Sequence, residues 1–112
     1  MSGEAPLAER RCVPCEGGVA PLTPGEAAAA LAKLDPAWRL DATGRRIERE
    51  FRCKNFYRVM SLVNAIAHIA NTEDHHPDIE LGYDYCRVRY TTHAIGGLSD
   101  NDFICAAKID RL

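Results

Sequence analysis

The feature that most constrains the fold is a change of hydrophobic period around residue 74. Upstream of it, apolar residues recur in steps of three and four: Phe56, Val59, Val63, Ile66 and Ala70. That spacing predicts an amphipathic helix. Downstream, residues 78–93 alternate between apolar and polar in two runs, and the phase slips near Asp84. This pattern predicts two antiparallel strands joined by a turn near Asp84.

The other segments complete the set of elements. Residues 23–26 have the composition of a capping box with proline in the first helical turn, which predicts a helix that ends at Asp35-Pro36. Residues 38–40 and 45–53 are predicted strands, and residues 99–102 open a last helix with a second capping box. The order is helix, two strands, helix, two strands, helix. It indicates an α+β fold, with a four-stranded antiparallel sheet and helices packed on one face.

Composition limits the partners and the location. The chain has 112 residues, with 14 basic and 16 acidic side chains and a net charge of −2. Such a balance argues against bulk attraction to nucleic acid or to an anionic membrane. No apolar run approaches the roughly 20 residues that span a bilayer. The start of the chain lacks the pattern of a secretory signal, and its five cysteines are scattered, so we expect a reducing, cytoplasmic location.

Residues 1–21 are rich in proline and glycine, which predicts an irregular N-terminal arm before a single domain at residues 22–112. Cys12 and Cys15 form a C-x-x-C motif in this arm. Half a zinc site and a redox pair are the functional interpretations, but the chain has no second such pair. A structural or incidental pair outside the candidate site is favoured, so Cys12→Ser and Cys15→Ser should leave turnover nearly intact.

Adjacent histidines precede the predicted hairpin, at His75 and His76, and are followed by a proline. If the turn centres on Asp84, His93 lies opposite His75 and Thr92 lies opposite His76. Three imidazoles would then converge at one end of the sheet. They could bind zinc, perform metal-free general acid–base chemistry, or form an incidental polar cluster. Adjacent histidines in a strand point apart, which weighs against zinc.

A longer pattern then becomes visible around these histidines. It runs from Asp74 through Pro77, meets Tyr83 after five residues and His93 after nine more, and closes at Asp102. This pattern resembles the signature of the pterin-4a-carbinolamine dehydratases. The resemblance covers roughly residues 20–112, and the C-x-x-C arm is similar to the start of bacterial members. One departure is Asn71, where some animal members carry glutamate.

The resemblance implies a reaction and a set of site residues. These enzymes remove water from a 4a-hydroxytetrahydropterin to give quinonoid dihydropterin, and so recycle the pterin of aromatic amino acid hydroxylases. It implies catalysis by His75, His76 and His93, in which His75 and His93 transfer protons and His76 mainly binds. The expected substrate-binding residues are Asp74, His75, His76, Thr91, Thr92, His93 and Ala94. Asp102 is expected mainly to cap the last helix.

The resemblance also implies that no metal or other cofactor is needed and that the chain forms a homodimer or homotetramer. No direct contact with nucleic acid or membrane is expected. Two alternatives stay open at this point. One is a dimerisation or binding module, because animal members also assist a transcription factor. The other is a metal-dependent hydrolase that uses the three histidines.

Overall fold

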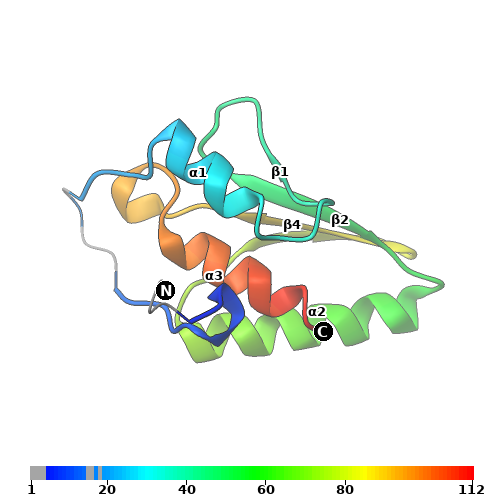
Figure 1. Cartoon of the computed structure of the whole chain (residues 1–112). Helices are drawn as coiled ribbons and strands as arrows, with labels where there is room; N and C mark the ends of the chain where they lie inside the picture. The colour runs from blue at the N-terminus through cyan, green and yellow to red at the C-terminus, as the bar shows by residue number, and fades with distance from the viewer. Residues whose placement is uncertain (1–4, 15–16, 18) are drawn as a thin grey trace.

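Four antiparallel strands form one sheet in the order β1–β2–β4–β3, with the helices on one side of it (Figure 1). The computed structural model describes residues 5–14, 17 and 19–112. Its elements are η1 (Leu7–Glu9), α1 (Pro24–Leu31), β1 (Arg39–Leu40), β2 (Ile47–Arg52), α2 (Phe56–Glu73), β3 (Asp78–Leu81), β4 (Tyr85–Tyr90), η2 (His93–Ile95) and α3 (Asp100–Ile109). The α+β architecture predicted from the hydrophobic periods is confirmed.

The central strand β4 shows why the sheet has one apolar face. Cys86, Val88 and Tyr90 are fully buried in the core, together with apolar residues of α2 and α3. Arg87 and Arg89 alternate with them on the outer face, where they form ion pairs with glutamates of β2 and β3. Each large apolar side chain buried in this way contributes roughly 1.5–3 kcal/mol.

Arg49 interrupts the alternation in β2, and the structure gives the reason. Its guanidinium lies 2.6 Å from Oδ1 of Asp110, the residue after α3. The same carboxylate oxygen accepts a hydrogen bond of 2.7 Å from Nε1 of Trp38, which is buried. A charged residue on the inner face of the sheet therefore ties β2 to the end of α3 and to the residue before β1.

The end of α2 sets the course of the histidine segment. Asp74 ends the helix in the left-handed conformation, with φ at 52°. Aspartate tolerates this conformation better than most residues. Pro77 cannot continue a helix, so His75 and His76 lie in a short link between α2 and β3.

The predicted register of the hairpin is wrong by one position. Asp78 pairs with Arg89 and Leu81 pairs with Cys86, while the backbone N–H of Gly82 donates to the carbonyl of Tyr85. The loop therefore contains two residues and does not centre on Asp84. The strands also end before the histidines, because β3 begins at Asp78 and β4 ends at Tyr90. His93 consequently does not pair with His75 across a ladder.

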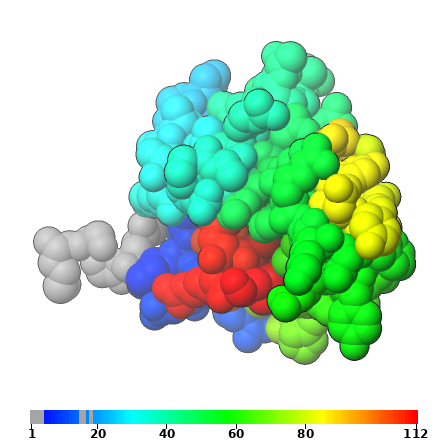
Figure 2. Space-filling model, turned by 90° about the vertical axis from the view of Figure 1, so that its right-hand side faces the viewer, coloured from blue at the N-terminus to red at the C-terminus, as the bar shows by residue number. Residues whose placement is uncertain are grey.

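The described part of the N-terminal arm lies against the body of the protein. The 3₁₀ turn η1 packs against α3, and Nζ of Lys108 donates a hydrogen bond of 2.9 Å to the carbonyl of Ala8. Figure 2 shows the blue residues of the arm in contact with the red residues of α3. Among the described helices, none is long and apolar enough to cross a membrane.

Candidate active site

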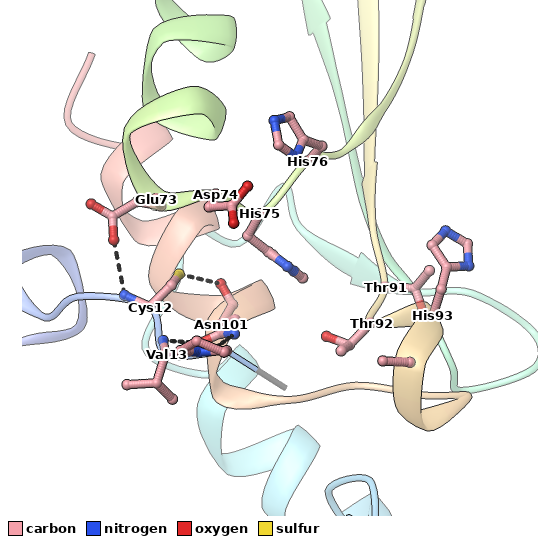
Figure 3. Close-up of a pocket in the computed structure, with 12 residues that line it drawn as sticks. Cys12, Val13, Glu73, Asp74, His75, His76, Thr91, Thr92, His93 and Asn101 are labelled. Carbon is pink, nitrogen blue, oxygen red and sulfur yellow. Dashed lines mark hydrogen bonds between the residues drawn. The ribbon is translucent and has the colours of Figure 1, made fainter. Parts of the chain in front are cut away.

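A cavity of about 570 Å³ lies where the end of α2, the start of η2, the start of α3 and the arm meet. It brings together all seven residues expected from the sequence to bind substrate: Asp74, His75, His76, Thr91, Thr92, His93 and Ala94. Five further residues line it, and the sequence did not single them out as site residues: Cys12, Val13, Pro14, Glu73 and Asn101. In Figure 3, His75 extends between the arm on one side and Thr92 and His93 on the other.

Asp102 anchors His75. Its Oδ1 lies 2.6 Å from Nε2 of His75, and its Oδ2 accepts hydrogen bonds from Oγ1 of Thr92 (2.8 Å) and from the backbone N–H of Ser99 (2.9 Å). The contact with Ser99 confirms the predicted capping box of α3. The same carboxylate therefore caps the helix and also orients a histidine of the cavity.

The Asp102–His75 contact is electrostatically strong because both side chains are shielded from water. The exposed fraction of the side chain is 0 % for Asp102 and 13 % for His75. Burial disfavours the imidazolium and lowers the pKa of His75, but the hydrogen bond and the charge of Asp102, together with smaller contributions from Cys105 and Asp74, outweigh burial, so the net pKa is raised. The His75 ring also stacks on Tyr90, with centroids 5.4 Å apart and an angle of 11° between the rings.

His76 and His93 lie at the exposed rim of the same cavity. Nε2 of His76 is 3.2 Å from Oδ1 of Asn71, which lies near the end of α2. His93 begins η2, which is separated from the end of β4 by Thr91 and Thr92, and Thr92 forms an isolated bridge with Gly97. The three histidines thus share one cavity through loop geometry and not through strand pairing.

The expectation that Cys12 lies outside the histidine cluster is wrong. Cys12 lines the same cavity as the three histidines, and its Sγ lies 3.6 Å from Sγ of Cys105 on α3. The second cysteine of the motif, Cys15, lies outside the described residues. Within the part of the chain that the structure describes, no three His, Cys, Asp or Glu side chains are arranged to hold a metal ion.

The geometry therefore defines a class of protein: an α+β domain with a histidine-lined cavity at one end of its sheet. The family model described as pterin 4 alpha carbinolamine dehydratase matches residues 20–112. The chain belongs to this family.

Curated relatives of the same family match this sequence over its whole length. A provisionally named pterin-4-alpha-carbinolamine dehydratase of Nitrosomonas eutropha is 55 % identical over 112 residues, which is 100 % of this chain and 97 % of the relative. A protein with the same provisional name from Dechloromonas aromatica is 52 % identical over the same shares of the two chains. The match therefore includes the arm that precedes the family model.

Solved structures show the same fold. A Brucella melitensis protein described as a transcriptional coactivator/pterin dehydratase superposes with a TM-score of 0.77 and 30 % identity, covering 81 % of this chain and 96 % of that one. A pterin dehydratase-like protein described as a RuBisCO assembly factor of the alpha-carboxysome gives a TM-score of 0.59 at 18 % identity, covering 67 % and 87 %. The second likeness concerns the fold alone.

Proposed function

We propose that this protein removes water from a 4a-hydroxytetrahydropterin and releases quinonoid dihydropterin. Membership of the family and the names of its relatives support the reaction class. The observation that carries the proposal for this chain is the buried Asp102–His75 pair in a cavity that also holds His76 and His93. A cavity of about 570 Å³ is in the range of small-molecule sites and has room for a bicyclic ring.

The reaction needs two proton transfers. The bond between C4a and the hydroxyl oxygen breaks, and the oxygen must be protonated as it leaves because hydroxide is a poor leaving group. The proton on N5 is lost, and its bonding electrons form the double bond between C4a and N5. The sum is loss of one water molecule without oxidation or reduction. Imidazoles suit both steps because they exchange protons near neutral pH.

The contacts favour His75 as the acid. Asp102 raises the pKa of His75, so the ring stays protonated up to a higher pH than an ordinary histidine. The reason is that the buried carboxylate stabilises the imidazolium. With Nε2 bonded to Asp102, Nδ1 is the atom proposed to protonate the leaving hydroxyl. His93 is proposed to take the N5 proton, and His76, whose ring contacts Asn71, is proposed mainly to bind the pterin.

Neighbouring residues are proposed to bind the pterin ring. Asp74, Thr91, Thr92 and Ala94 complete the lining beside the histidines. We further propose that residues 22–112 form the dehydratase domain, that the protein works as a cytoplasmic homodimer or homotetramer, and that it serves the pterin cycle of an aromatic amino acid hydroxylase. No metal or other cofactor is required in this proposal.

A stopped-flow assay tests the reaction directly. A 4a-hydroxytetrahydropterin is generated chemically, and its dehydration is followed with and without enzyme, the uncatalysed rate being subtracted. Wild-type protein should accelerate dehydration, and His75→Ala should remove most of the acceleration. His68→Ala is the matched control, because His68 is exposed on α2 and does not line this cavity. A wild-type rate equal to the uncatalysed rate would overturn the proposal.

A further inference from the structure

We propose that residues 11–14 form one wall of the pterin pocket and that Asn101 and Glu73 are positioning residues that hold this wall in place. The inference rests on the proposed function and deepens it, since it assigns part of the substrate affinity to a segment that precedes the family match at residues 20–112. The wall is defined by Cys12, Val13 and Pro14, which line the cavity. In Figure 3, Cys12 and Val13 lie opposite Thr92 and His93.

Asn101 holds the wall with both ends of its side-chain amide. The backbone N–H of Val13 donates to Oδ1 of Asn101 at 3.1 Å, and Nδ2 of Asn101 donates to the carbonyl of Val13 at 2.6 Å. This reciprocal pair imitates the pairing of two strands and leaves Val13 little freedom to move. Asn101 is 4 % exposed, and it directly precedes Asp102, which orients His75. One turn of α3 therefore positions both the wall and a proposed catalytic residue.

Glu73 provides the second anchor from the last position of α2. Its Oε1 accepts a hydrogen bond of 2.9 Å from the backbone N–H of Cys12. Its Oε2 lies 3.3 Å from Nε of Arg11 and 3.8 Å from Nζ of Lys108. The Glu73 side chain is only 4 % exposed, so these contacts compensate a carboxylate that would be costly to bury alone. The link that carries His75 begins at the next residue.

Val13 shows what the wall offers to a ligand. Its backbone is held at both polar groups, yet the residue is 65 % exposed and lines the cavity. Holding an apolar side chain rigidly at the edge of a polar cavity prepares a surface for the face of a flat ring. The proton-transferring histidines come from other segments, so the wall should affect pterin affinity and leave the chemical step alone.

The experiment measures the Kd of a stable dihydropterin together with kcat and KM. Asn101→Ala should raise Kd and KM by about tenfold, because two hydrogen bonds that fix the wall are lost, and kcat should stay within about twofold. Val13→Ala should raise the Kd by about threefold through lost apolar contact. The double variant should bind no more weakly than Asn101→Ala alone, since both changes act on one contact.

The control removes a different contact of the same arm. Glu9→Gln breaks an exposed ion pair with Arg111, 3.5 Å long and outside the cavity, and it should leave the Kd unchanged. A bound dihydropterin should also slow tryptic cleavage after Arg11 in the wild type and in Glu9→Gln, but not in Asn101→Ala.

Three outcomes would count against the wall. The first is an unchanged Kd in Val13→Ala, which keeps the proposal testable even if Asn101→Ala fails to fold. The second is a fall of kcat at constant Kd in Asn101→Ala, which would mean that Asn101 acts through Asp102. The third is a rate of tryptic cleavage after Arg11 of the wild type that stays the same when dihydropterin is bound. Wild-type protein that binds no dihydropterin would instead overturn the proposed function, and the wall with it.

Discussion

Replacing Asp102 with asparagine tests the centre of the proposed mechanism. The change keeps the volume of a fully buried side chain but removes the charge that faces Nε2 of His75 at 2.6 Å. The single oxygen of asparagine can replace only one of the two carboxylate oxygens, so it keeps either the contact with His75 or the two contacts with Thr92 and Ser99. The amide nitrogen must then meet a donor, either at His75 or at Thr92 and Ser99.

The magnitude follows from the kind of bond that is lost. A hydrogen bond to a charged group contributes about 1.5–3 kcal/mol. If the Asp102 hydrogen bond stabilises the transition state in which His75 delivers its proton, its loss should lower kcat by about 10- to 150-fold. The range follows because about 1.4 kcal/mol corresponds to a factor of ten. The loss of a buried, fully paired carboxylate should also lower the free energy of unfolding by about 2–4 kcal/mol.

The pH dependence has a definite sign. Asp102 raises the pKa of His75 above its ordinary value of 6.5 in the folded protein. The stabilisation from this shift is therefore fully present below pH 6.5 and is lost as pH rises through the folded pKa. Urea unfolding of wild type and Asp102→Asn on both sides of pH 6.5 should show the larger difference at the lower pH. The alkaline limb of kcat should move to lower pH in the variant.

Stopped-flow dehydration with the uncatalysed rate subtracted is the activity assay. Ser99→Ala is the matched control, because it removes the hydroxyl that caps α3 and its 2.7 Å contact with Thr92, but keeps both side chains of the Asp102–His75 pair. It should change kcat by less than about threefold. Asp102→Asn protein that is folded and keeps the wild-type kcat and pH profile would refute the assignment of His75 as the acid.

Three further predictions concern the histidines, metal and stability. His75→Ala and His93→Ala should chiefly lower kcat and should be less than additive when combined, while His76→Ala should chiefly raise KM; full activity in both single variants would contradict the assignment. Dehydration by EDTA-treated protein should match that of untreated protein, and a loss restored by zinc would contradict metal-free catalysis. Asp110→Ala should lower the free energy of unfolding, measured in urea, by about 2–4 kcal/mol. The reason is that the Arg49 guanidinium, whose side chain is 17 % exposed, loses its 2.6 Å partner. An unchanged urea midpoint would contradict this account.

Local sequence determined the elements. Steps of three and four predicted α2, alternation predicted β3 and β4, and the capping residues Thr23 and Ser99 marked the starts of α1 and α3. These signals suffice because a helix or strand exposes one face at its own period, and a cap satisfies backbone groups a few residues away. The motif from Asp74 to Pro77 likewise indicated which segment carries the candidate site.

Longer-range relations needed the tertiary structure. The sequence pattern predicted that His93 lies opposite His75. The hairpin loop has two residues, which shifts the register by one position, and His93 lines the cavity from η2. The pairing of His75 with Asp102 joins residues 27 positions apart, and the pairing of Cys12 with Glu73 spans 61. No periodic pattern encodes such contacts, because they arise only when α2, α3 and the arm pack together. The sequence by itself determined the helices and strands and the histidines and carboxylates available for catalysis. Packing decided that Asp102 contacts His75 and that the backbone of the N-terminal arm lines the cavity.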